Sequence, residues 1–230
     1  MGQNNSIISY IKKEKITDCL HWLNENSEAG AEAPLQLIID SKETSLRGSG
    51  FKLNDHRSSY LDRHEIVKDF DVLHFITSLI FDIDPDLLTS LATGWMKFNR
   101  GLEYLEDFKE SFESAYLGNG KMRYGNYESK IIWLKDQEVF VFQFVAVTTD
   151  MSIAMEKSPA VKKWMIDFSR NADAILTHLD QDYNGRRILF YRGKEIDVTI
   201  CEGNDEEPFG LPRSFLDDYL KLALTYDRNK

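Results

Sequence analysis

The hydrophobic pattern changes its period at residues 118–120, and this change constrains the fold more than any other feature of the sequence. Upstream, apolar residues over 66–81 and over 99–117 recur every three or four positions, which is the spacing of one face of a helix. Downstream, residues 121–134 and 139–147 are rich in β-branched and aromatic side chains and flank a short polar turn. This composition favours two antiparallel strands.

The rest of the N-terminal half completes this pattern. Residues 7–23 carry apolar positions at helical spacing and predict one broken helix or two short ones. Residues 35–40 form a compact apolar run of strand length, and a polar, glycine-containing loop is expected after it, to about Tyr60. The sequence DIDPD ends the helix over 66–81, and we expect Asp84 or Asp86 to cap the next one.

The C-terminal half returns to helical spacing over 158–179, with Ser158 as the cap and Pro159 at the first helical position. The segments RRILFY and EIDVTIC flank a short turn and predict a second hairpin. A final helix is expected from Ser214 to about Tyr226.

These segments predict an α+β fold with a helical N-terminal half followed by two antiparallel hairpins, in the order β-β-α-β-β-α. One sheet packed on helices is the expected core. We interpret residues 1–230 as a single domain, because the breaks at 82–86 and 118–120 are too short and too stiff in composition for linkers. The alternative is a subdivision into a mainly helical part, 1–117, and a β-β-α-β-β-α part, 118–230.

Composition excludes several classes of function. The chain has 28 Lys and Arg against 38 Asp and Glu, a formal net charge of −10, which argues against nucleic-acid binding. Cys19 and Cys201 cannot form a disulfide framework, and no Cys/His cluster has zinc spacing, so we expect no metal and no cofactor. No run of about 18 apolar residues is present, and the start lacks the apolar core of a secretory signal. We therefore expect a cytoplasmic protein.

The acidic residues are concentrated in two places, a helix and a loop. Along the predicted helix over 99–117 they recur at spacings of three and four, which places them in one row. The row consists of Glu103, Glu106, Glu110 and Glu113. The loop before the last helix contributes Glu202, Asp205, Glu206 and Glu207. Acidic rows steer basic partners quickly and specifically, but such carboxylates also serve simply as a solvated face that keeps a protein soluble.

The general profile of size, acidity, α+β pattern and missing catalytic motifs looks like that of bacterial immunity proteins, which neutralise a toxin domain by covering its basic active site. The likeness implies a protein that inhibits or sequesters a basic protein partner. Our leading hypothesis is therefore a binding protein that uses these eight acidic residues.

The competing hypothesis is a metal-dependent nuclease. Nucleases of the PD-(D/E)xK type place an Asp and a Glu-x-Lys on adjoining strands, so that two carboxylates hold Mg²⁺ and the lysine orients the water. The segment EIDV at 195–198 resembles one of these strands, which would assign metal binding to Glu195, Asp197 and Glu202. The pattern then departs from the family, because Asn204 stands where lysine is expected.

A third hypothesis is a lipidated effector that acts at a host membrane. Gly2 followed by Ser6 matches the signal for N-myristoylation. Because one myristoyl chain binds membranes only marginally, Lys12, Lys13 and Lys15 would have to supply a second, basic signal.

Overall fold

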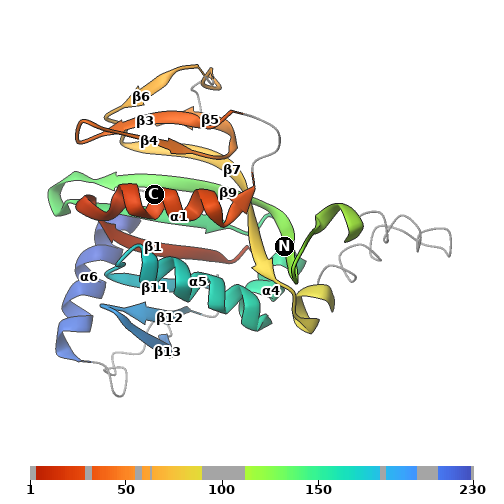
Figure 1. The fold of residues 1–230 in the computed structure, drawn as a ribbon. Coiled ribbons are helices and arrows are strands. Elements are labelled where there is room, and N and C mark those ends of the chain that lie inside the picture. Colours follow the sequence, from red (N-terminus) through yellow and green to blue (C-terminus); the bar gives the residue numbers. More distant parts are fainter. Residues whose placement is uncertain are drawn as a thin grey trace.

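The computed structural model describes residues 4–28, 33–54, 59–62, 64–89, 112–181, 185–200 and 212–228, with the side chains of 223–228 excepted. Most of these residues belong to one large antiparallel sheet and to helices that cover it (Figure 1).

The main sheet has ten strands. Eight of them lie in the order β13-β12-β11-β1-β10-β9-β7-β2, while β5 pairs with β7 and β8 pairs with β9. The strands are β1 (Ser6–Lys12), β2 (Ser27–Glu28), β5 (Ser49–Leu53), β7 (Val72–Asp82), β8 (Tyr116–Gly118), β9 (Lys121–Leu134), β10 (Val139–Val145), β11 (Leu176–Asp180), β12 (Arg186–Tyr191) and β13 (Lys194–Ile200). The N-terminal strand β1 thus lies inside the sheet, paired with β10 on one side and β11 on the other.

A smaller sheet of three strands lies beside the β7 side of the main one (Figure 1). Its strands are β3 (Leu35–Ile39), β4 (Lys42–Leu46) and β6 (Ile66–Lys68). Strands β3 and β4 form a hairpin whose two turn residues, Asp40 and Ser41, both have positive φ angles. This is the backbone twist that suits a two-residue hairpin turn.

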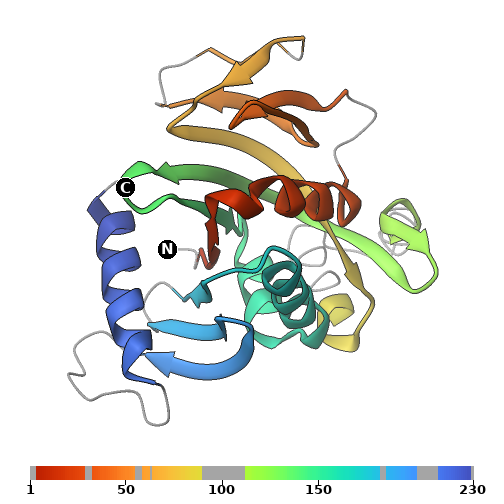
Figure 2. The same ribbon diagram turned by 60° about the vertical axis from the view of Figure 1, so that its left-hand side comes forward.

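Helices cover both faces of the main sheet (Figure 2). The labelled helical segments are η1 (Lys13–Lys15), α1 (Ile16–Glu25), η2 (Lys135–Gln137), α4 (Thr149–Lys157), α5 (Pro159–Asn171) and α6 (Arg213–Arg228). Residues 85–89 and 112–115 are also helical and border undescribed residues. Strand β10 illustrates the result: Phe142 packs with Phe168 of α5, while Val141 belongs to the core cluster that includes Phe215 of α6. A strand buried on both faces has a nearly continuous apolar sequence.

The prediction of an α+β fold with a helical N-terminal half is wrong, because the described residues of this half lie more in strands than in helices. Residues 66–81 form β6 and most of β7, in which alternate side chains from Leu73 to Phe81 face the core. Both faces of β7 carry apolar residues, so the pattern of a buried strand imitates that of a buried helix. Residues 7–23 likewise divide into β1, η1 and α1, and the expected loop before Tyr60 contains β4 and β5.

The C-terminal predictions agree better with the structure. The hairpins β9–β10 and β12–β13 are present, and the strand at 35–40 is β3. Helix α5 begins as predicted, with the Ser158 hydroxyl accepting from the Val161 N–H and proline at the first helical positions. It ends at Asn171, however, because residues 176–180 pair with β1 and β12 as strand β11. The final helix is α6.

Candidate cation-binding pocket

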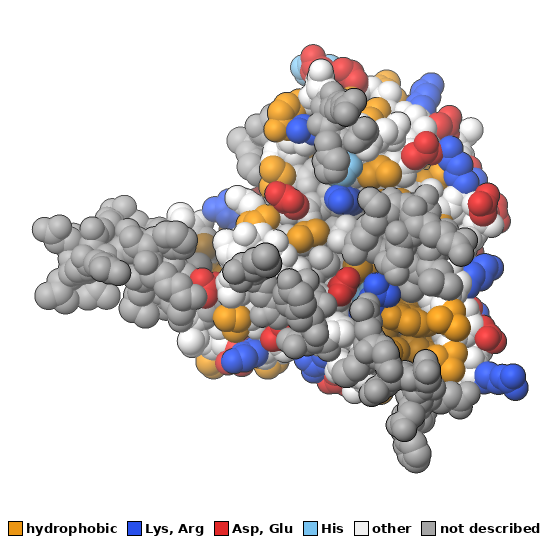
Figure 3. Space-filling view, turned by 180° about the vertical axis from the view of Figure 1, so that it is seen from behind, with side chains coloured by type: hydrophobic (Ala, Val, Ile, Leu, Met, Phe, Trp, Pro, Cys, Tyr) orange, Lys and Arg blue, Asp and Glu red, His pale blue; other side chains and the backbone are white. Residues whose placement is uncertain are grey.

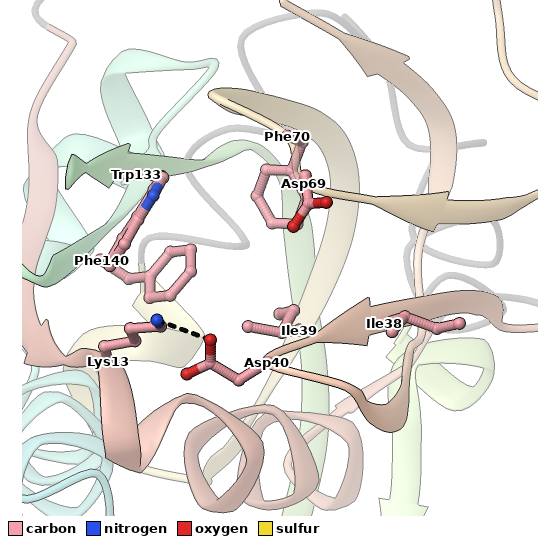
Figure 4. A pocket seen from close by; sticks show the side chains of 8 residues that line it. All are labelled: Lys13, Ile38, Ile39, Asp40, Asp69, Phe70, Trp133 and Phe140. Carbon is pink, nitrogen blue, oxygen red and sulfur yellow. Dashed lines mark ion pairs between the residues drawn. The ribbon is translucent and has the colours of Figure 1, made fainter.

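A small pocket lies between the two sheets, at the end of β3 and beside the β9–β10 hairpin (Figure 4). Its volume is about 80 Å³. The side chains that line it come from η1, β3 and its turn, the loop between β6 and β7, β9 and β10. They are Lys13, Ile38, Ile39, Asp40, Asp69, Phe70, Trp133 and Phe140.

One wall of the pocket is aromatic. Trp133 and Phe140 lie opposite each other in the β9–β10 register, and their rings stack with centroids 4.4 Å apart. Phe70 packs against Phe140 at 6.1 Å between centroids. The backbone N–H of Trp133 donates to the carbonyl of Asp71 at 2.8 Å, which fixes the loop before β7 to the hairpin. The aromatic wall is therefore built on hydrogen-bonded strands rather than on a free loop.

Two carboxylates stand at the rim, each at a sharp bend of the backbone. Asp40 has φ of 51° and Asp69 has φ of 47°. Both values lie in the left-handed region, which Asp and Asn adopt more readily than other non-glycine residues. In Figure 4 the two carboxylates lie on opposite sides of the space in front of Trp133 and Phe140.

Lys13 shows which ligand chemistry this arrangement accepts. Its Nζ lies 2.6 Å from Oδ1 of Asp40 and 5.5 Å from the centroid of the Trp133 ring. The hydrogen bond to Asp40 raises the pKa of Lys13, and the charges of Asp40, Glu138 and Asp69 add to this effect against the cost of desolvation. An ammonium group is thus held by a carboxylate and by an aromatic face, as in sites that recognise organic cations.

The surroundings of the pocket have an excess of negative charge. Lys135 pairs with Asp71 at 2.6 Å, and Asp69 also raises the pKa of Lys135. The charges that raise the pKa of Lys13 and Lys135 are those of Asp40, Asp69, Asp71 and Glu138. The carboxylates next to these ammonium groups therefore favour a cation over an anion at the position of Lys13.

The acidic residues predicted from the sequence fall mostly outside the described part of the chain. Residues 103, 106 and 110 of the acidic row and residues 202, 205, 206 and 207 of the loop lie in undescribed segments. Glu113 is exposed on a helical segment at 112–115, after which residues 116–118 form β8. Seen from behind, the described surface carries acidic and basic side chains intermingled (Figure 3).

Two of the three carboxylates of the nuclease hypothesis, Glu195 and Asp197, lie on β13 and are paired with basic side chains. Glu195 pairs with Arg170. Asp197 accepts from Nε of Arg187 at 2.6 Å and from Nζ of Lys162 at 2.6 Å. The bond from Arg187 is the main reason that the pKa of Asp197 falls well below its usual range. Within the described residues, no group of three or more His, Cys, Asp or Glu side chains is suited to hold a metal ion. Glu202 lies outside the described residues.

The structure tests only part of the lipidation hypothesis. Gly2 is outside the described residues. Lys12 is the last residue of β1, and Lys13 and Lys15 lie in η1 directly after it. Lys13 is moreover bound to Asp40. No helix within the described ranges has both the length and the apolar character of a membrane span.

Comparison of the chain with protein-family models, with curated proteins and with solved structures found no match. The pocket itself was missed in the sequence because its residues come from four separate segments around positions 13, 40, 70 and 135. One part of the pocket is visible in the sequence: the polar turn KDQE between two aromatic strands predicts that Trp133 and Phe140 meet. The sequence does not show which residues lie opposite these two rings.

Proposed function

We propose that the protein binds a basic protein partner in the cytoplasm, which it inhibits or sequesters, and that the aromatic–carboxylate pocket receives a cationic side chain of that partner. The observation that supports this proposal is the position of Lys13, whose ammonium group is paired with Asp40 and lies over the ring of Trp133. A lysine of the partner that replaces Lys13 makes the same contacts.

Charge and pocket have complementary parts in this proposal. A net charge of −10 attracts a basic partner over a distance and raises the rate of encounter. Long-range attraction does not fix an orientation, whereas a ring and a carboxylate on rigid elements do. Interfaces concentrate their binding energy in a few aromatic and charged side chains near the centre, and Trp133 beside Asp40 has this character.

A defined probe tests the proposal without a known partner. An oligolysine peptide is titrated into the wild-type protein at low and at high salt, and binding is followed by calorimetry. We expect Trp133→Leu to weaken binding about fivefold, since the cation–π contact with one lysine is lost.

Tyr60→Leu is the matched control, because Lys52 lies 4.2 Å from the Tyr60 ring at a surface site outside the pocket. If Trp133→Leu and Tyr60→Leu change the affinity equally, the pocket is not the binding site.

Reversing Glu103, Glu106 and Glu110 to lysine tests the acidic row separately: we expect slower association and a weaker dependence on salt. Unchanged binding would reduce the row to a solvated face.

A further inference from the structure

We propose that Lys13 is an internal ligand of the pocket, which a lysine side chain of the partner displaces. This inference rests on the proposed function and adds a regulatory step to it. The wild-type protein then binds through an exchange of one ammonium group for another, and the affinity for the partner depends on how firmly Lys13 is held.

The backbone of Lys13 is fixed, so that its side chain alone has to move. The Lys13 N–H donates to the carbonyl of Glu138 at 2.9 Å, at the point where β1 ends and η1 begins. Beyond this anchor, the side chain of Lys13 is 28% exposed and that of Asp40 is 53% exposed. The side chain of Lys13 is thus half-buried, and side-chain rotation is fast compared with protein association. The pocket can therefore open without a change in either sheet.

The strength of the internal contact sets the size of the effect. Exposed ion pairs and exposed cation–π contacts are both weak interactions. The apparent affinity for an external cation equals the intrinsic affinity of the open pocket multiplied by the fraction of molecules in which Lys13 has left it. Together the two contacts predict that Lys13 lowers the affinity of the pocket for an external ammonium group about tenfold.

Lys13→Met removes the ammonium group that Asp40 holds and keeps an unbranched side chain of similar length. Lys135→Met is the matched control, because Lys135 also pairs with an exposed aspartate but does not line the pocket. Both variants change the net charge by the same amount. The probe is Nα-acetyl-lysine N-methylamide, and the readout is the NMR signal of the Trp133 indole N–H, assigned with Trp133→Leu.

We expect Lys13→Met to bind the probe about tenfold more tightly than the wild type and Lys135→Met to stay within about twofold of the wild type. Adding Asp40→Asn to Lys13→Met should cancel the gain, since the carboxylate that holds the cation is then missing. Thermal unfolding of each variant, followed by circular dichroism, shows that it is folded.

Equal affinities of Lys13→Met and Lys135→Met would overturn the inference, because the gain would then come from net charge. Weaker binding by Lys13→Met than by the wild type would also overturn it. In either case the proposed function survives if binding of oligolysine still depends on Trp133. If neither probe causes a change that depends on Trp133 in any variant, the inference and the use of this pocket in the proposed function both fail.

Discussion

Replacing Asp84 with alanine should lower the free energy of unfolding by about 2 kcal/mol, because one carboxylate caps two helices. Asp84 follows β7, and its Oδ1 accepts from the Leu87 N–H at 2.8 Å, at the start of the helical segment 85–89. Its Oδ2 accepts from the Ala160 N–H at 2.8 Å and from the Ser158 hydroxyl, at the start of α5. The carboxylate thus ties the residues after strand β7 to the first turn of helix α5.

The magnitude follows from these two caps. Removing a side-chain cap from one helix N-terminus costs about 1 kcal/mol. Asp84 satisfies free N–H groups at two N-termini, so that the sum is about 2 kcal/mol. The pKa of Asp84 agrees with a carboxylate that is stabilised by these hydrogen bonds. Desolvation raises this pKa, but the hydrogen bonds from Ser158, Leu87 and Ala160 outweigh desolvation and lower the pKa below its ordinary value.

The pH dependence follows from the same direction. A carboxyl whose pKa is lower in the folded state contributes stability that is complete above its unfolded pKa of about 4. This contribution is lost as the pH falls through the lower pKa of the folded state. The difference in stability between the wild type and Asp84→Ala should therefore be constant near neutral pH and shrink below about pH 4.

Equilibrium urea unfolding, followed by tryptophan fluorescence, measures the effect. Asp86→Ala is the control, because it removes the same charge from an exposed position two residues further on, and it should cost no more than about 0.5 kcal/mol. A double-mutant cycle with Ser158→Ala should give a coupling energy of about 1 kcal/mol, since the two side chains are in contact. Equal costs for Asp84→Ala and Asp86→Ala, or a coupling energy of zero, would refute the reasoning.

Three further predictions test other parts of the structure. Gly125→Ala should lower the free energy of unfolding by about 1 kcal/mol more than Gly120→Ala. Both glycines have positive φ, but only at 125 would a Cβ come within 2.6 Å of Cε of Met151. Equal losses of stability for the two variants in urea unfolding would contradict this contact. Tyr127→Phe should leave the stability unchanged or raise it by up to about 1 kcal/mol, since the buried Tyr127 hydroxyl has no hydrogen-bond partner among the described residues; a large loss in thermal unfolding would reveal a partner. Calorimetric titration with Mg²⁺ should give the same heat for the wild type and for Asp197→Ala, because the Asp197 carboxylate is already paired with two cationic side chains. A heat of binding that is lost in Asp197→Ala would favour the nuclease hypothesis.

Local chemistry was enough to predict several elements from the sequence. Ser158 and Pro159 predict the start of α5 because capping involves neighbouring residues only. Asp84 was one of two predicted caps for the same reason, and its bond to the Leu87 N–H confirms it. The hairpins β9–β10 and β12–β13 were predictable because their strands are adjacent in sequence and joined by short turns. The excess of acidic residues is likewise a property of the sequence alone.

Tertiary structure alone decided the N-terminal half and the pocket. The sequence of 66–81 does not decide between a helix and a strand, since apolar residues on both faces of β7 erase the alternation that identifies a strand, although Ile76 on its second face is exposed. Strand β1 is a strand because β10 and β11, more than 120 residues away in sequence, supply its hydrogen-bond partners. The pocket depends on the same long-range pairing: Lys13, Asp40 and Trp133 meet where β1, the β3–β4 turn and β9 converge. A periodic pattern reports only a residue's neighbours in sequence, whereas this site consists of neighbours in space.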